Sequence, residues 1–233
     1  MQVGSGATPL RVKLCGIRSR ADLTVALNAG ADALGFIVGA RHRTEDELTP
    51  AAAAELVALL PPFVSSVMVT HLQQATPIIA LLQQVGATTL QLQDAITPTE
   101  LQAIRSAQPG VKLIRAIHVH DGDAGAQSIA EAIAAEPLVD ALLLDSRTAD
   151  RIGGTGLPHD WSVSRRIVQQ IRKPVFLAGG LRPENLRAAL ETVGPAAVDV
   201  NSGIEDATGA KDAERAQAFV QICRSWSQLP LVP

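Results

Sequence analysis

The chain has 233 residues, of which 47% are apolar and 18% charged, with a formal net charge of −3 at pH 7. This length and apolar content are enough for one large buried core. The charge shows no basic excess, which argues against nucleic acid or an anionic membrane as the partner.

Two cysteines, Cys15 and Cys223, lie near opposite ends of the sequence. Their spacing fits neither a disulfide framework nor a zinc site, which predicts a reduced, cytoplasmic setting. No stretch approaches the ~18 uninterrupted apolar residues of a membrane span, and the first residues lack the apolar centre of a signal peptide. Residues 1–10 and 226–233 are small or interrupted by proline, so we expect a loose lead-in and a tail.

Short β-rich runs alternate along the chain with longer stretches of helix-forming residues. The predicted strands are Val12–Cys15, Ala33–Val38, Val64–Val69, Thr88–Leu92, Lys112–Ile117, Val139–Leu144, Pro174–Ala178 and Ala197–Val200. The predicted helices that follow them are Ser19–Asn28, Pro50–Leu60, Thr76–Val85, Pro98–Ala107, Ala124–Ala135, Asp160–Ile171, Pro183–Glu191 and Lys211–Ser225.

Local signals mark several of these helix ends. Ser19 is a suitable N-cap for the first helix, and Gly30 is placed to end it. Thr49 and Thr97 each precede a proline, the pairing of a cap with a first helical residue that has no N–H to satisfy. The pair Pro61-Pro62 stops the second helix.

Strands that alternate with helices of about 10–15 residues imply parallel strands joined by right-handed crossovers. Eight such units in a chain of this length predict an α/β protein whose sheet closes into a (β/α)₈ TIM barrel. No linker-like change of composition divides them, so residues 1–233 are expected to form one domain. The alternative is an open flavodoxin-like sheet with extra elements, which usually contains fewer units.

In a barrel of this kind, chemistry gathers where strands end and loops begin. Two glycine-containing turns, Gly179-Gly180 and Ser202-Gly203, follow the seventh and eighth strands and predict a seat for a phosphate made by backbone amides. Each pair alone also fits a tight strand-to-helix turn. Asp145 ends the sixth strand and precedes the glycine-rich loop Gly153–Gly156, which places an acid beside a possible anion site.

A set of motifs in a fixed order resembles the phosphoribosylanthranilate isomerase family, a barrel of tryptophan biosynthesis. The motifs are Val12–Ile17, Asp22 with Ala26, Gly30–Phe36, Leu144-Asp145, Gly153–Gly156 with Asp160-Trp161, Leu177–Leu181 with Pro183–Asn185, and Val198–Glu205 with Gly209 and Lys211-Asp212. The resemblance covers residues 11–224.

The resemblance implies an Amadori rearrangement that needs no cofactor and no metal. It makes Cys15 the general base and Asp145 the general acid, and the expected substrate is a phosphorylated sugar amine, N-(5-phosphoribosyl)anthranilate. The product would be 1-(o-carboxyphenylamino)-1-deoxyribulose 5-phosphate. The chemistry itself asks for a proton donor to the ring oxygen and a base for a carbon-bound proton. Taken alone, Cys15 also fits a buried small apolar residue and Asp145 a loop cap.

The expected substrate-binding residues are Arg43, Asp199, Gly154, Gly179, Gly180, Ser202 and Gly203. Arg43 is assigned to the anthranilate carboxylate, with Arg41 as a competitor, and Asp199 would orient the substrate or the loop of the acid. A turn-capping carboxylate is the alternative for Asp199.

The family pattern is broken at several positions. Met68 and Gln93 replace a customary phenylalanine and histidine, Thr70-His71 follows the third strand, and His159 stands where a phenylalanine is usual. These departures leave the reaction type intact and leave the aglycone open. A paralogous isomerase that acts on a different aminated ribose phosphate is therefore an alternative.

Two other function classes remain open. His118 and His120 face the same side of the fifth strand, and His71, Asp94, Asp121 and Asp145 also follow strands, a possible ligand set for a metal-dependent barrel hydrolase. A sensor that binds a sugar phosphate without turning it over is the second class. The sequence also leaves open whether the chain is a monomer or a homodimer.

Overall fold

The computed structural model describes residues 10–41, 44–120, 124–146 and 161–226. Eight strands pair in parallel in chain order, and the last pairs with the first, so the sheet closes into a barrel. The strands are β1 (Arg11–Leu14), β2 (Ala33–Ile37), β3 (Ser65–Thr70), β4 (Thr89–Leu92), β5 (Lys112–Val119), β6 (Ala141–Ser146), β7 (Val175–Leu177) and β8 (Ala197–Val200). The predicted (β/α)₈ barrel is confirmed.

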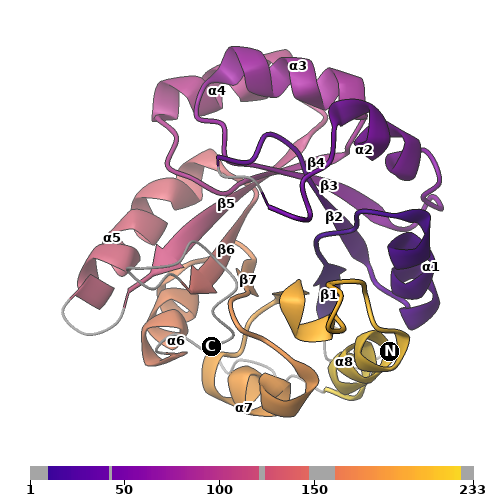
Figure 1. Cartoon of the computed structure of the whole chain (residues 1–233). Helices are drawn as coiled ribbons and strands as arrows, with labels where there is room; N and C mark the ends of the chain where they lie inside the picture. The colour runs from indigo at the N-terminus through magenta and orange to yellow at the C-terminus, as the bar shows by residue number, and fades with distance from the viewer. Residues whose placement is uncertain (1–9, 42–43, 121–123, 147–160, 227–233) are drawn as a thin grey trace, which may run out of the picture.

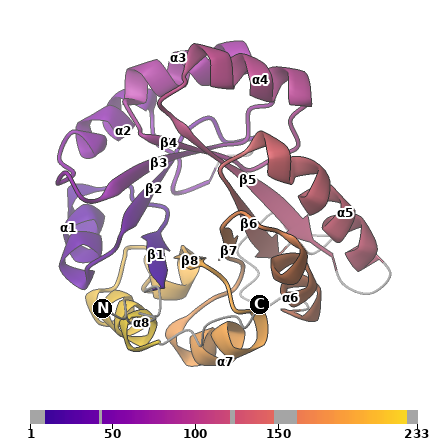
Figure 2. The same cartoon turned by 180° about the vertical axis from the view of Figure 1, so that it is seen from behind.

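The helices form a ring outside the barrel (Figures 1 and 2). They are α1 (Arg20–Ala29), α2 (Pro50–Val57), α3 (Ala75–Val85), α4 (Pro98–Ala107), α5 (Gly125–Ala135), α6 (Trp161–Gln170), α7 (Pro183–Val193) and α8 (Ala213–Ser225). Two short 3₁₀ turns, η2 (Glu136–Leu138) and η3 (Ser202–Ile204), precede β6 and follow β8. Within the described residues, no helix is both long enough and apolar enough to cross a bilayer.

The predicted helix caps are confirmed. Ser19 accepts a hydrogen bond from the Asp22 backbone N–H, and Thr49 and Thr97 cap α2 and α4 in the same way. Gly30 ends α1 in the left-handed conformation, at φ 85°. Because these signals act over three or four residues, they could be read from the sequence without knowledge of the tertiary structure.

Some predicted boundaries differ from the structure. The second helix ends at Val57 rather than Leu60, because the chain tightens into a turn in which the Leu60 N–H bonds to the Val57 carbonyl before Pro61. The fifth strand continues past Ile117 because Val119 pairs with Ser146 of β6. These differences arise from contacts between elements, which local patterns do not record.

Two groups of apolar side chains fill the protein. The larger lies between the sheet and the helices, and it includes Leu14, Phe36 and Met68. The smaller lies inside the barrel, with Val67 and Leu143 among its members and Cys15 at its edge. Since successive strand residues point to opposite faces, the inward side chains of each strand fill the barrel and support the rim above.

Candidate active site

A cavity of about 410 Å³ opens at the rim formed by the carboxyl ends of the strands. This volume suits a small-molecule ligand. Seven of the nine site residues expected from the sequence line it: Cys15, Asp145, Gly179, Gly180, Asp199, Ser202 and Gly203. The other two, Arg43 and Gly154, lie outside the described residues, as do His159 and Asp121.

Cys15 follows β1 and is buried, with a relative exposure of 6%. Gly35 of β2 faces it, and a Cβ atom at Gly35 would lie 2.6 Å from the Cys15 Sγ and 3.0 Å from the Lys13 Nζ. The missing side chain of Gly35 therefore makes the space that the thiol and the ammonium occupy. The same two groups are neighbours because Lys13 and Cys15 are two residues apart on one face of the strand.

Lys13 forms a buried ion pair with Asp199 of β8. Its Nζ lies 2.9 Å from each carboxylate oxygen, and the two side chains are 4% and 8% exposed. Burial lowers the pKa of Lys13, but the Asp199 carboxylate and Cys15 outweigh this effect, so the pKa is raised overall and the ammonium stays charged. Asp199 is therefore paired inside the barrel rather than capping a turn.

The Lys13–Asp199 ion pair affects the pKa of the Cys15 thiol. Burial raises the pKa of Cys15, the Lys13 ammonium opposes that rise, and the Asp199 carboxylate adds to it, with a net increase. A group with a raised pKa is a stronger base once ionised. By contrast, Cys223 lies inside α8, away from the rim, and burial raises its pKa to about 12, so this thiol stays protonated.

The charge of Lys13 is open to a direct test. Lys13→Gln keeps a donor for Asp199 but removes the charge that opposes the rise in the Cys15 pKa. If the base must be ionised and the acid protonated, the alkaline limb of the kcat/KM profile follows the group of higher pKa, here the thiol. We expect that limb to move to higher pH and kcat/KM to fall by about 10-fold for each unit that it moves.

The shift in the thiol can be measured without turnover, from the pH dependence of Cys15 alkylation in a Cys223→Ala background. The matched control is Lys112→Gln, because the Lys112 side chain is 70% exposed. An alkylation profile that is the same for Lys13→Gln and Lys112→Gln would contradict the role given to Lys13.

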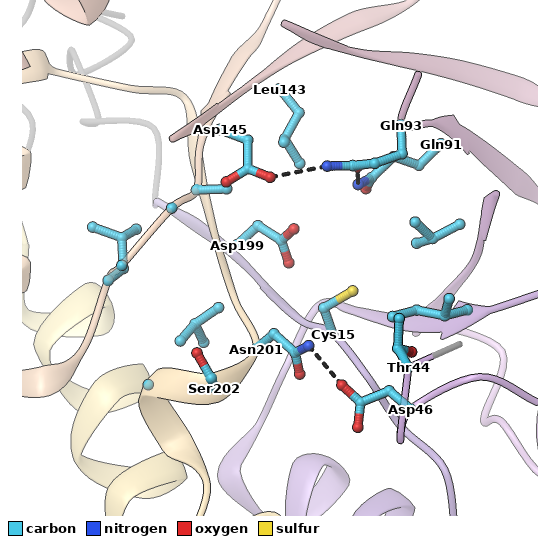
Figure 3. Close-up of a pocket in the computed structure, with 18 of the residues that line it drawn as sticks. Cys15, Thr44, Asp46, Gln91, Gln93, Leu143, Asp145, Asp199, Asn201 and Ser202 are labelled. Carbon is cyan, nitrogen blue, oxygen red and sulfur yellow. Dashed lines mark hydrogen bonds between the residues drawn. The ribbon is translucent and has the colours of Figure 1, made fainter. Parts of the chain in front are cut away.

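Asp145 lies near the end of β6, on the same rim as Cys15. Figure 3 shows the two side chains entering the cavity from different walls, with Asp199 between them. The Gln93 Nε2 donates to the Asp145 Oδ2 over 2.9 Å, and His118 is the register partner of Asp145 on β5. A carboxyl group and a thiol therefore face one enclosed space, as two-group proton transfer requires.

The glycine turns after β7 and β8 adjoin each other at the cavity wall. Gly179 and Gly180 have φ angles of 80° and 64°, which only glycine adopts readily. Gly203, in the turn after β8, lies so close to the turn after β7 that a Cβ atom at this position would be 1.8 Å from the Leu181 carbonyl oxygen. The Arg215 guanidinium donates to the Gly203 carbonyl and fixes the turn from behind.

Gly203→Ala tests the predicted phosphate seat. The added Cβ forces the turn away from Leu181, which moves the backbone amides of the seat. Because a hydrogen bond to a charged group contributes about 1.5–3 kcal/mol, we expect KM for a ribose 5-phosphate substrate to rise by about 10-fold or more. Gly110→Ala is the control, since no atom lies within 4 Å of its Cβ position. An unchanged KM in a folded Gly203→Ala variant would place the phosphate elsewhere.

Several contacts at the rim were not expected from the sequence. The Asn201 side chain donates to Asp46 over 2.8 Å and accepts from Lys211 over 2.5 Å, which ties the segment after β2 to the end of β8. Asn201 and Asp46 are 155 residues apart, so no local pattern could predict the contact. Lys13 could have been found, because a strand residue two positions before Cys15 must share its face.

Two residues that the sequence left in question at the aglycone, Met68 and Arg41, do not line the cavity. Met68 was one of the departures expected to bear on the aglycone, but its side chain is fully buried between sheet and helices, while Val67 and Val69 point into the barrel. That expectation is wrong, because alternation along β3 turns Met68 outward. Arg41 is 58% exposed and its Nη1 lies 3.6 Å from the Asp94 Oδ2, in an ion pair outside the cavity lining.

The His and Asp side chains that the sequence offers as metal ligands do not form a cluster in the part of the chain that the structure describes. Among residues 10–41, 44–120, 124–146 and 161–226, no three His, Cys, Asp or Glu side chains are grouped as a metal site would need. His118 lines the cavity and bonds to the Gln93 carbonyl, whereas His120 is exposed. The described residues therefore give the metal-dependent hydrolase no support.

Comparisons with known proteins agree with this geometry. Residues 12–222 match the family model described as N-(5'phosphoribosyl)anthranilate (PRA) isomerase. N-(5'-phosphoribosyl)anthranilate isomerase 2 of Methanosarcina mazei is 39% identical over 213 residues, 91% of this chain and 92% of that protein.

Solved structures are similar as well. Phosphoribosyl anthranilate isomerase from Thermotoga maritima is 29% identical with a TM-score of 0.80, and the match covers 93% of this chain and 100% of that one. A phosphoribosyl anthranilate isomerase in complex with reduced 1-(o-carboxyphenylamino)-1-deoxyribulose 5-phosphate is 28% identical, with a TM-score of 0.76 and the same coverage. The chain, with its barrel, its rim cavity and this similarity along nearly its whole length, belongs to the phosphoribosylanthranilate isomerase family.

Proposed function

We propose that the protein catalyses the Amadori rearrangement of N-(5-phosphoribosyl)anthranilate to 1-(o-carboxyphenylamino)-1-deoxyribulose 5-phosphate in tryptophan biosynthesis. One observation supports this proposal most strongly. Cys15 and Asp145, which are distant in the sequence, line one cavity together with the glycine turns after β7 and β8. Neither proton transfer requires a cofactor or a metal.

The first step belongs to Asp145. Its carboxyl group gives a proton to the ribose ring oxygen as the bond from C1 to that oxygen breaks, and the nitrogen lone pair forms the C1–N double bond. Ring opening leaves a hydroxyl group on the sugar and a protonated Schiff base at C1. The acid has to be held against the leaving oxygen, because general acid catalysis depends on hydrogen-bond geometry.

The second step belongs to Cys15. Its thiolate removes the proton from C2, and the electrons of that C–H bond move into the Schiff base to give an enolamine. The enolamine then tautomerises to the ketone. The buried Lys13 ammonium stabilises the thiolate electrostatically, since an opposite charge within a few ångströms favours the ionised form.

The phosphate would bind the backbone amides near Gly179, Gly180, Ser202 and Gly203, where turns that need glycine bring N–H groups close to an anion. Arg43 remains our assignment for the anthranilate carboxylate. The engagement of Arg41 with Asp94 supports it, because Arg41 already has an acidic partner.

Substrate comparison tests the proposal against the two alternatives. Purified protein should consume N-(5-phosphoribosyl)anthranilate with loss of its anthranilate-type fluorescence, at a kcat/KM well above that for ribosylamine 5-phosphates with other N-substituents. A paralogous isomerase would invert that preference. A sugar-phosphate sensor would bind ribose phosphates and turn over none of them.

We further propose that the protein works in the cytoplasm, where a reducing environment keeps Cys15 available as a base.

Of the oligomeric states left open, the structure favours the homodimer, because Phe63 is 98% exposed at an edge of a second cavity lined by Val12, Phe176 and Ala197. Covering such a residue with a second copy would remove apolar surface from water. A mass from light scattering that corresponds to one chain would contradict the dimer.

A further inference from the structure

Two glutamine side chains connect the end of β4 to the acid of the proposed reaction. Gln91 and Gln93 are two residues apart and both line the cavity. The Gln91 Nε2 donates to the Gln93 Oε1 over 2.9 Å, and the Gln93 Nε2 donates to the Asp145 Oδ2 over 2.9 Å. Figure 3 shows this chain of hydrogen bonds along one wall of the cavity.

Neighbouring strands fix the position of Gln93. Its backbone N–H bonds to the Thr70 carbonyl of β3 over 2.9 Å, and its carbonyl lies 2.9 Å from the His118 Nε2 of β5. With the backbone held on both sides and the amide oxygen occupied by Gln91, the amide N–H is directed at Asp145. Such pre-organisation by surrounding groups is what a positioning residue needs.

Gln91 has a feature that a purely structural glutamine would rarely have. It is 2% exposed, and its Oε1 has no hydrogen-bond partner within the described residues. Leaving a buried carbonyl unpaired costs stability, so a fold that uses this amide only for support would be expected to satisfy it. The arrangement instead uses the amide N–H of Gln91 to hold Gln93 and leaves the Gln91 oxygen buried without a partner among the described residues.

We propose that Gln91 and Gln93 form an amide relay that positions the general acid: Gln93 occupies the Asp145 Oδ2, so that the catalytic proton is carried on Oδ1. This inference rests on the proposed function for the identity of the acid. A donor fixed on one carboxylate oxygen makes that oxygen an acceptor only, and the proton is directed to the other. After proton transfer, the same N–H stabilises the carboxylate that forms.

Glutamine differs from the histidine customary at position 93 because an amide does not titrate. The relay therefore orients the acid without a second protonation equilibrium at that position. The titratable and charged groups that line the same cavity come from other elements: Cys15 after β1, Asp46 from the segment after β2, His71 after β3, His118 on β5, Asp199 on β8 and Glu205 after η3. Lys13 of β1 lies behind Asp199 as its buried ion-pair partner.

Gln93→Leu removes the donor and Gln93→His restores one. We expect kcat of Gln93→Leu to fall by about 10-fold or more, because small displacements of a catalytic group are costly, while KM changes little. The acid limb of its pH profile moves to higher pH, since a hydrogen bond to the carboxylate favours the ionised form. Gln93→His should recover most of kcat, and Gln91→Leu should show a smaller loss in the same direction.

A carbon-13 titration of the Asp145 carboxyl group tests the relay independently of turnover. The resonance is assigned by its loss in Asp145→Asn, and its midpoint should lie at higher pH in Gln93→Leu than in the wild type. Gln102→Leu on α4 is the control, because the Gln102 amide is exposed and bonds only to Ser106 among the described groups.

An unchanged Asp145 midpoint in Gln93→Leu would overturn the relay, whatever the protein turns over. If Gln93→Leu and Gln93→His both have a lower melting temperature and lose kcat equally, Gln93 gives structural support only. That result would also overturn the relay. A wild-type protein that does not consume N-(5-phosphoribosyl)anthranilate contradicts the proposed function instead, and the carboxyl titration separates these two failures.

Discussion

Replacing Cys15 by serine is expected to lower kcat by about 10²- to 10⁴-fold, the range that a general acid or base contributes. The two side chains have nearly the same shape, so the buried site beside Gly35 should accept serine without displacement. The hydroxyl, however, stays protonated at any pH that the fold tolerates and cannot remove a carbon-bound proton. KM should change little, because the phosphate seat after β7 and β8 is untouched.

The control for this experiment is Cys223→Ala, which removes the other thiol from α8 and should leave kcat near the wild-type value. Steady-state rates from fluorescence loss provide the measurement. If Cys15→Ser retains wild-type kcat, the base is a different group and the role of the thiol is wrong.

Replacing Asp145 by asparagine should lower kcat by a similar factor of about 10²–10⁴. Asparagine fills the same space and can still accept the hydrogen bond from Gln93 through its amide oxygen. It has no proton to give to the ring oxygen, so ring opening must proceed with water or no acid at all. The expected signature is a lost kcat with retained binding of a product analogue.

Asp140→Asn provides a matched control, because Asp140 lies just before β6 and Asp145 lies near the other end of the same strand. Asp140 precedes β6, bonds to Arg105 and to the Leu113 backbone N–H, and lies outside the rim cavity. We expect the control to affect stability more than turnover. Equal kcat values for Asp145→Asn and Asp140→Asn would remove Asp145 from the mechanism.

Much of the fold could be predicted because its signals are local. Alternating apolar runs, the caps Ser19, Thr49 and Thr97, and the glycine after α1 fixed the order and type of all eight units. The ends of elements were less predictable. The last turn of α2 and the extension of β5 depend on what each segment meets in space, as the pairing of Val119 with Ser146 illustrates.

In the candidate site, too, some features could be predicted from the sequence and others could not. Barrel closure puts all strand ends on one rim, which is why Cys15, Asp145 and the glycines could be placed together from sequence. The partners that set their chemistry could not. Lys13 and Asp199 are separated by 186 positions, and the contact of Gln93 with Asp145 spans 52, so both require the closed barrel to be known.

The most direct test of the account is a turnover measurement on chelator-treated protein with N-(5-phosphoribosyl)anthranilate, run beside Cys15→Ser and Asp145→Asn. We predict loss of the substrate fluorescence and formation of 1-(o-carboxyphenylamino)-1-deoxyribulose 5-phosphate by the wild type, at a rate that chelation does not change, and turnover at least about 100-fold slower by each variant. Wild-type protein that leaves the substrate unchanged, or variants that match its rate, would contradict an acid–base isomerase built on this pair.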